Sequence, residues 1–111
     1  MIDVIMQFGT DIIMVRVKGN SVSFGSKVGH NPMMATIDGL KLSRSGVIKE
    51  FPELADTDNW REEAIAKFKD KIKGLNDENK IVSYVVDDLS KFGYKPLYKQ
   101  KQGMRIERFK T

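Results

Sequence analysis

The stretch that decides the fold runs from Asp56 to Pro96 and reads DTDNWREEAIAKFKDKIKGLNDENKIVSYVVDDLSKFGYKP. Its apolar residues recur mainly at steps of three and four, which places them on one face of a helix with a 3.6-residue period. The pattern occurs twice, and a glycine follows each copy, Gly74 after the first and Gly93 after the second. Glycine readily takes the left-handed conformation that ends many helices. The stretch therefore predicts two consecutive amphipathic helices.

Polar residues mark where each helix begins. Thr57, Asp58 or Asn59 is expected to cap the first helix, just before Trp60. Either Asn76 or Asp77 is expected to cap the second helix, and Pro96 prevents that helix from continuing. Because only a few residues separate the helices, we expect an antiparallel or steeply crossed pair.

Residues 2–24 alternate apolar and polar side chains, which is the period of a β-strand. Gly9-Thr10 and Gly19-Asn20 are candidate two-residue turns within this segment. In the resulting register Val4 lies opposite Val15, and Val15 lies opposite Phe24. One face stays apolar through both turns, so the pattern predicts a three-stranded antiparallel meander.

The segment between this meander and the helices gives weaker signals. Gly25 to Pro32 is interpreted as a loop, and Asp38-Gly39 predicts a hairpin that pairs Ala35 with Leu42. The polar run 43–46 is interpreted as an ordinary turn, with anion binding by its backbone N–H groups as the alternative. Residues 47–51 are expected to add a short strand.

A chain of 111 residues fits a single domain, spanning residues 1–111. The predicted class is α+β: an N-terminal antiparallel β-meander of three to five strands, packed by two consecutive amphipathic helices, with a C-terminal basic β-hairpin around Gln102-Gly103. The predicted core consists of the apolar residues on the two facing surfaces: Ile2, Val4, Met6, Ile13, Val15, Val17, Val22, Phe24, Ala64, Ile65, Phe68, Ile72, Val82, Val85, Val86 and Leu89.

Three apolar residues fall on the opposite face of the meander, namely Ile5, Ile12 and Met14. A monomer rarely leaves such a patch exposed. We expect a loop or helix to cover this corner, and a homodimer contact through the same residues is the alternative.

Composition excludes several kinds of chemistry. The chain has no cysteine, so disulfides, thiolate zinc sites and cysteine nucleophiles are excluded. His30 is the single histidine, and the adjacent Asp87 and Asp88 diverge by about 100° around a helix. We therefore expect no catalysis and no metal or organic cofactor. Residues 1–8 lack the basic start of a signal peptide, and no apolar run approaches the roughly 18 residues of a membrane span. A cytoplasmic location without a membrane partner is expected.

The best functional signal is the distribution of charge. The whole chain carries +4, whereas residues 94–111 hold six basic residues and one acidic residue, a net charge of +5. Basic residues contact phosphates and aromatic rings stack on bases. The tail therefore predicts nucleic-acid binding with little sequence preference, through Lys95, Tyr98, Lys99, Lys101, Arg105, Arg108 and Lys110.

Two other interpretations of the tail stay open. Lysines on a solvated hairpin also guard a sheet edge against aggregation. A protein-interaction or inhibitor module, acting through the sheet face or the hairpin, is the second functional hypothesis. A winged helix is disfavoured, because Asp77, Glu78, Asp87 and Asp88 make the helix before the hairpin acidic.

Overall fold

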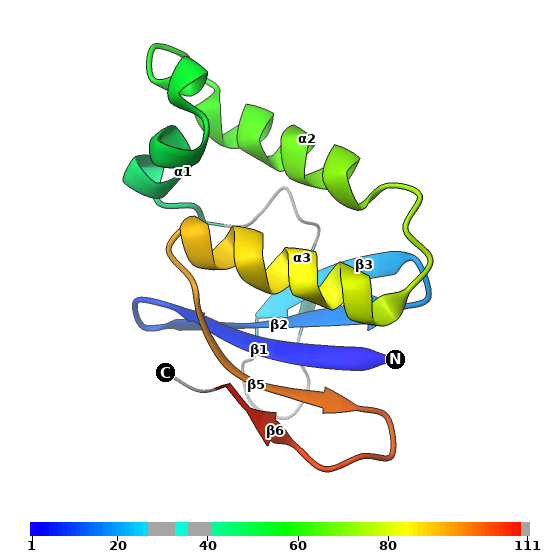
Figure 1. Cartoon of the computed structure of the whole chain (residues 1–111). Helices are drawn as coiled ribbons and strands as arrows, with labels where there is room; N and C mark the ends of the chain where they lie inside the picture. Colours follow the sequence, from blue (N-terminus) through cyan, green and yellow to red (C-terminus); the bar gives the residue numbers. More distant parts are fainter. Residues whose placement is uncertain (27–32, 36–40, 110–111) are drawn as a thin grey trace.

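The computed structural model of the chain describes residues 1–26, 33–35 and 41–109 (Figure 1). Four strands come first: β1 (Ile2–Phe8), β2 (Asp11–Lys18), β3 (Ser21–Ser26) and β4 (Met33–Ala35). The helical part follows: α1 (Arg44–Glu50), the 3₁₀ turn η2 (Pro52–Leu54), α2 (Trp60–Ile72) and α3 (Glu78–Lys91). Two strands complete the described chain: β5 (Lys95–Lys101) and β6 (Glu107–Arg108).

The strands form one antiparallel sheet, in the order β4-β3-β2-β1-β5-β6. Val4 lies opposite Val15, and Val15 lies opposite Phe24, as the alternation predicts. Gly9 and Gly19 both have a φ of 61°, a conformation that side chains rarely adopt. The predicted meander, its register and both turns are confirmed.

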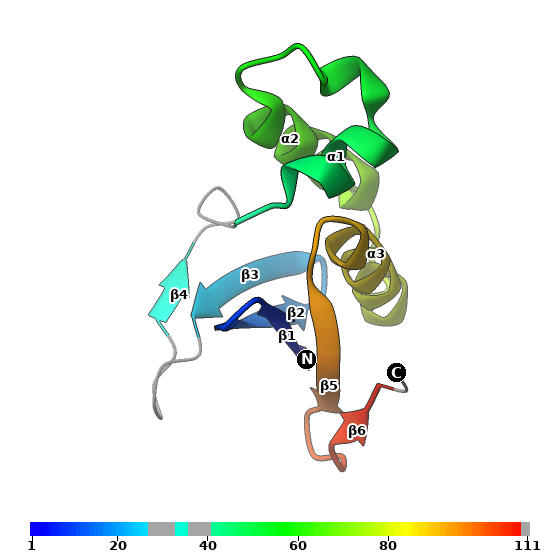
Figure 2. The same ribbon diagram turned by 90° about the vertical axis from the view of Figure 1, so that its left-hand side faces the viewer.

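All the described helices lie on one side of the sheet (Figure 2). Helix α3 contacts β1, β2 and β5. Helix α2 reaches the sheet through Phe68, whose ring centroid lies 6.5 Å from that of Phe24. The predicted α+β class, with two amphipathic helices packed on a meander, is confirmed.

The predicted core is buried between these layers. Val15 is 0% exposed and Phe68 is 3% exposed, whereas four predicted residues are only partly buried at its margin: Ile13, Val22, Ile72 and Val86. The remaining predicted core residues are buried. The structure adds further apolar residues from the helices and the segments around them, among them Leu42, Val47, Leu54, Ile81, Phe92 and Tyr94.

The two long helices begin and end near the predicted residues. Asp77 caps α3, because its side chain accepts hydrogen bonds from the N–H groups of Asn79 and Lys80. Asn59 is the residue before α2, but its side chain donates to Glu63 instead of capping the helix. Gly74 and Gly93 have φ angles of 84° and 106°, the left-handed stops that the sequence predicts.

The predicted turn at 43–46 and strand at 47–51 are wrong, because these residues form α1. Ser43 caps this helix, and its Oγ accepts a hydrogen bond from the N–H of Gly46 at 3.3 Å. Val47 is completely buried, and the Phe51 ring lies 6.3 Å from that of Phe92. Val47 enters the core from α1 and the Phe51 ring after the helix packs on Phe92, so these distant contacts override the strand preference of the Val-Ile pair.

The predicted loop from Gly25 to Pro32 is wrong at its start, because Gly25 and Ser26 belong to β3. Gly25 is paired with Met14 on one side and with Met34 on the other, and hydrogen bonding on both sides holds it in the sheet. The rest of that segment, His30 and the predicted Asp38-Gly39 hairpin lie outside the described residues.

The apolar residues on the sheet face away from the helices are mostly covered. Ile5 is 4% and Met14 is 7% exposed, whereas Ile12 is 37% exposed. Ile5 lies opposite Tyr98 in β5. Of the three residues proposed as a subunit contact, only Ile12 therefore offers an exposed apolar side chain.

Helix α1 packs very closely on the end of α3. Ser43 N donates a hydrogen bond to Phe92 O at 2.8 Å, and a Cβ added at Gly46 would overlap the carbonyl oxygen of Lys91. Backbone atoms cannot move aside as a flexible side chain can. Position 46 therefore requires glycine, although it lies inside a helix.

The first prediction tests this contact. Gly46→Ala should destabilise the protein by about 1–3 kcal/mol through overpacking, although alanine favours helix formation by about 1 kcal/mol. Urea unfolding measures the change, and Lys49→Ala in the exposed last turn of α1 is the matched control. An unchanged midpoint for Gly46→Ala would show that α1 does not approach α3 this closely.

The second prediction concerns Tyr94, whose ring packs 5.1 Å from that of Phe8. Burial raises the pKa of Tyr94 to about 12. An unfolded tyrosine has a pKa of about 10, so between these values the unfolded state loses a proton that the folded state keeps. The free energy of unfolding should fall as pH rises through this window, by about 3 kcal/mol at most.

Urea unfolding of wild type and Tyr94→Phe at about pH 8 and about pH 11 isolates this effect from that of other groups. The alkaline loss of stability should be smaller in Tyr94→Phe, which has no phenol to ionise. Equal losses in the two proteins would show that Tyr94 titrates normally.

Candidate functional site

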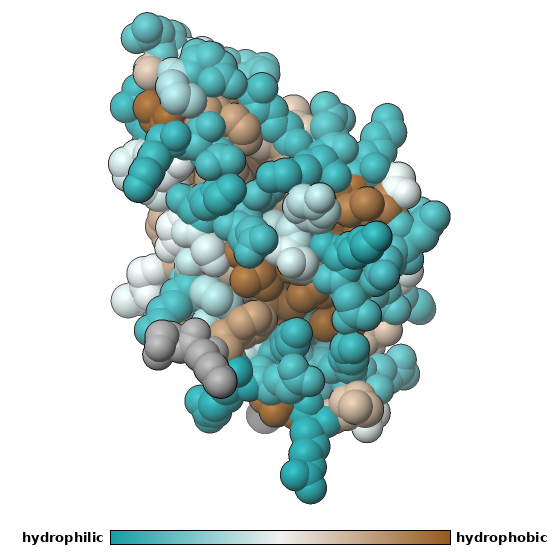
Figure 3. All heavy atoms as spheres, in the orientation of Figure 1, coloured by the Kyte–Doolittle hydropathy of each residue, from teal (hydrophilic) through white to brown (hydrophobic). Residues whose placement is uncertain are grey.

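Two hollows adjoin between α3 and the C-terminal strands, with volumes of about 380 and 370 Å³. Both are lined by Ile2 and Asn79, so they are neighbours, and the two together are called here the α3–hairpin groove. In the orientation of Figure 1, hydrophobic residues show between hydrophilic ones in the region of α3 and β5 (Figure 3). The groove is lined by Met1, Ile2, Glu78, Asn79, Val82, Ser83, Val86, Asp87, Lys99, Lys101, Gln102, Met104 and Phe109.

The floor of the groove is apolar. Ile2 comes from β1, and Val82 and Val86 lie one helical turn apart on α3. Phe109 follows β6, and its N–H donates a hydrogen bond to Leu97 O at 3.1 Å, which fixes the end of the hairpin beside the helix. Four apolar side chains from three separate parts of the chain therefore meet here.

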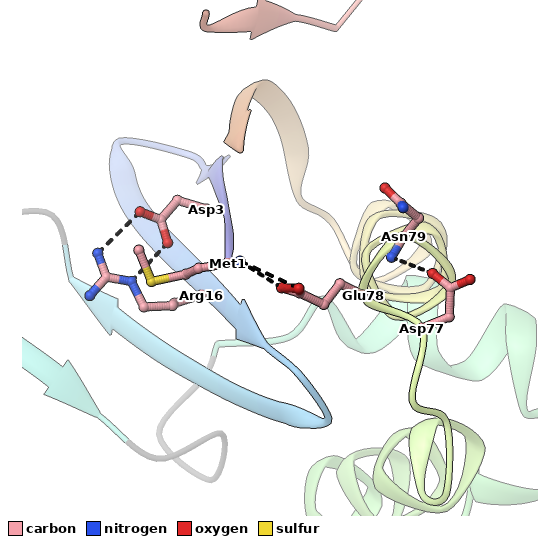
Figure 4. Close-up of polar contacts among 6 residues, drawn as sticks. All are labelled: Met1, Asp3, Arg16, Asp77, Glu78 and Asn79. Atoms are coloured by element: carbon pink, nitrogen blue, oxygen red, sulfur yellow. Dashed lines mark hydrogen bonds and ion pairs between the residues drawn. The ribbon is translucent and has the colours of Figure 1, made fainter. Parts of the chain in front are cut away.

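The helix wall of the groove is polar and acidic. It consists of Asn79, Ser83 and Asp87, at the spacing of one side of a helix, whereas Glu78 lies on the other side of the valine pair. Glu78 reaches the amino group of Met1 (Figure 4): Oε1 accepts a hydrogen bond at 3.4 Å, and Oε2 forms an ion pair at 2.9 Å. This contact ties the first turn of α3 to the start of β1.

The strand wall is basic. Lys99 lies opposite Val4 and Lys101 lies opposite Ile2, so both lysines share the helix-facing side of the sheet. Lys99 Nζ lies 3.8 Å from Glu107 Oε2 and 5.8 Å from the centroid of the Phe109 ring. An anionic wall and a cationic wall thus flank the apolar floor.

The structure separates the residues that the sequence predicts to act together. Tyr98 lies opposite Ile5, Arg108 lies opposite Tyr98, and Lys95 lies opposite Gln7. These three therefore share the sheet face away from the helices, which is the other side from Lys99 and Lys101. Arg105 lies in the exposed segment between β5 and β6, and Lys110 lies outside the described residues.

An ion pair and buried apolar side chains occupy the centre of the sheet face away from the helices. Arg16 donates two hydrogen bonds to the carboxylate of Asp3, at 2.8 and 3.1 Å (Figure 4). These hydrogen bonds to Asp3 raise the pKa of Arg16 above its ordinary value. Ile5 and Met14 beside this pair are buried. Among the described strand residues on this face, the ring on which a base could stack is the partly buried Tyr98, at the hairpin end.

Sequence reasoning missed the helix wall of the groove. It assigned Val82 and Val86 only to the core and interpreted Glu78 and Asp87 only as charges that oppose nucleic acid. The available signal was the polar series at positions 79, 83 and 87, which follows a helical turn beside the valine pair. The role of this polar series depends on the strand that faces it, β5, and the sequence alone does not reveal that β5 lies there.

A larger hollow of about 510 Å³ lies between β3 and the end of α2. Its walls include Val22, Ile72, Lys73 and Gly74, but it contains none of the residues that the sequence singled out for binding. In the described ranges, no three His, Asp or Glu side chains gather in a way that suits a metal ion. No helix among the described residues is long and apolar enough to cross a membrane.

Comparisons of the chain with protein-family models, curated proteins and solved structures found no match.

The two faces of the hairpin give the third prediction. Phosphates near Lys99 and Lys101 would meet Glu78 and Asp87, so nucleic-acid binding by the hairpin should depend on the opposite face. The double reversal Lys95→Glu with Arg108→Glu should reduce the slope of log affinity against log salt by about two units, one per lost contact.

The double reversal Lys99→Glu with Lys101→Glu is the matched control, because it changes the charge equally and should leave that slope unchanged. Titrations of single- and double-stranded DNA and RNA at several salt concentrations measure both variants. A larger loss in the Lys99 and Lys101 variant would place nucleic acid in the groove instead.

Proposed function

We propose that the protein is a non-catalytic binding module that holds another protein in the α3–hairpin groove. The observation that carries this proposal is an apolar floor between an anionic wall and a cationic wall. Protein interfaces combine an apolar centre with a polar rim in the same way. Charges of both signs suit a protein partner, which can offer both signs in return.

The groove is less suited to nucleic acid. A phosphate chain would be attracted by Lys99 and repelled by Asp87 across the same floor. The hairpin tip also exposes two large apolar residues, Met104 at 59% and Ile106 at 56%. Methionine adapts its shape to a partner, and exposed apolar area is typical of protein-interaction surfaces. Both features support a protein partner.

Nucleic acid is the second candidate partner, and one observation favours it. Lys95, Arg105 and Arg108 are exposed, in the region that carries most of the excess positive charge. The nucleic-acid hypothesis is therefore retained for the hairpin face that lies away from the helices.

Several expectations from the sequence stay predictions beside this proposal. They are the absence of catalysis and of a cofactor, the cytoplasmic location, and a homodimer through the face that contains Ile5, Ile12 and Met14. For such a dimer, Ile12 is the residue whose change should matter most, because Ile5 and Met14 are already buried.

The fourth prediction concerns a substitution that fills the groove without removing core atoms. Ser83 is exposed on the helix wall, so Ser83→Trp should occupy the groove and leave the stability nearly unchanged. Lys80→Trp, on an exposed part of α3 outside the groove lining, is the matched control. Immobilised wild type and both variants are incubated with cell extract, with and without nuclease treatment, and retained proteins are quantified by mass spectrometry.

A partner of the groove should be retained by wild type and by Lys80→Trp, and reduced at least about tenfold on Ser83→Trp, which corresponds to about 1.4 kcal/mol. Equal retention by all three proteins would remove the groove from the binding surface. Retention that disappears with nuclease treatment, together with binding of purified DNA or RNA, would favour the second candidate.

A further inference from the structure

We propose that the occupant of the α3–hairpin groove is an amphipathic α-helix of the partner protein, which places basic residues along α3 and acidic residues along β5. This inference rests on the proposed function and specifies the shape and charge of the partner. It follows from three properties of the groove: the backbone pairing of its walls, its length and the charges of its two walls.

The first property is that the groove is bordered by the helix-facing side of β5, where Lys99 and Lys101 lie, and not by the edge of that strand. The β5 backbone is paired with β1 on one side and with β6 at Tyr98 and Lys99 on the other. The facing wall is a helix, whose backbone groups are bonded internally. An extended peptide would find no backbone partners there and would leave its own N–H and C=O groups unpaired. A helix satisfies its backbone groups itself, so it fits these walls.

The second property is length. Asn79 and Asp87 lie at the two ends of the helix wall, eight residues apart on α3. That separation is about 12 Å along the axis, or a little over two helical turns. A helix of this length presents three apolar side chains at i, i+3 or i+4, and i+7. These side chains would cover the floor of Ile2, Val82, Val86 and Phe109.

The third property is the charge of the walls. Asp87 attracts cations on the side of α3, whereas Lys99 and Lys101 attract anions on the side of β5. A helix with basic residues on one flank of its apolar stripe and acidic residues on the other satisfies both walls. Turning such a helix end to end exchanges its flanks, so the same charges also set the direction in which it lies.

The test uses designed helical peptides of about 15 residues, a length at which isolated helices begin to be stable. All share one apolar stripe at helical spacing. The mixed peptide has lysines on one flank and glutamates on the other, the basic peptide has lysines on both, and the acidic peptide has glutamates on both. A fourth peptide carries the mixed charges with a central proline, which breaks the helix. Calorimetry or fluorescence anisotropy measures binding to the full chain.

Wild type should bind the mixed peptide about tenfold more tightly than the basic or acidic peptide, since each single-sign peptide loses attraction at one wall and meets repulsion there. The proline peptide should bind about tenfold more weakly than the mixed one. The advantage of the mixed peptide should shrink at high salt, because exposed charges are screened.

Variants of the walls should redirect the preference. Lys99→Glu with Lys101→Glu makes both walls acidic, so this variant should prefer the basic peptide. Asp87→Lys should shift the preference toward the acidic peptide. Combining all three changes exchanges the main charges of the walls, so the mixed peptide should again be preferred, bound in the opposite direction. Lys80→Trp should bind as wild type does, and Ser83→Trp should lose binding of every peptide.

Equal binding of the mixed and proline peptides would rule out a helical occupant, and equal binding of the three charge patterns would rule out the assigned wall charges. Absence of binding by every peptide would overturn the inference as well. In each of these cases, loss of an extract protein on Ser83→Trp would still support the proposed function. If single-stranded RNA displaced the bound peptide at low salt, the groove would be assigned to nucleic acid. That result would overturn both the helical occupant and the proposed function.

Discussion

The pairing of β1 with β5 is the interaction on which the rest of the structure depends. It places a strand from the end of the described chain beside the first strand, which also pairs with β2. Because α3 leads directly into β5, the same pairing holds α3 over the sheet. Without it the hairpin would have no fixed position beside α3, and the groove would have only one wall.

The pairing also decides where the charges of the hairpin lie. Its register shifts between Ile5 and Met6, because Leu97 in β5 has no partner there. Such a bulge reverses the alternation of side chains on one strand. Lys95 consequently shares a face with Tyr98 instead of with Lys99 and Lys101. The odd-numbered positions of the three lysines suggest a common face, but the single unpaired residue Leu97 places Lys95 on the other face.

Features that depend on neighbouring residues were predictable from the sequence, and features that depend on distant contacts were not. The meander followed from alternation that agrees with two turns, and α2 and α3 followed from their apolar stripes and glycine stops. Helix α1 was missed because Val47 and Ile48 favour strands and Gly46 is unfavourable in helices. The reason for that glycine is the Lys91 carbonyl, which lies far along the chain. For the candidate site, the basic residues of the hairpin were evident, but the acidic wall opposite Lys99 depends on the same long-range packing.

The position of β5 has a consequence for how the chain is made. Strand β1 leaves the ribosome well before β5, so one of its two edges finds its partner only when β5 has been synthesised. At about 5–20 residues per second, the β1 edge stays open for roughly 5–20 s. During that time Ile2, Val4 and Met6 belong to an unpaired apolar edge, the kind that recruits strands from other molecules. Newly made chains are therefore most vulnerable to aggregation until β5 has been synthesised after α3. A chaperone that binds the chain during this interval would protect it most.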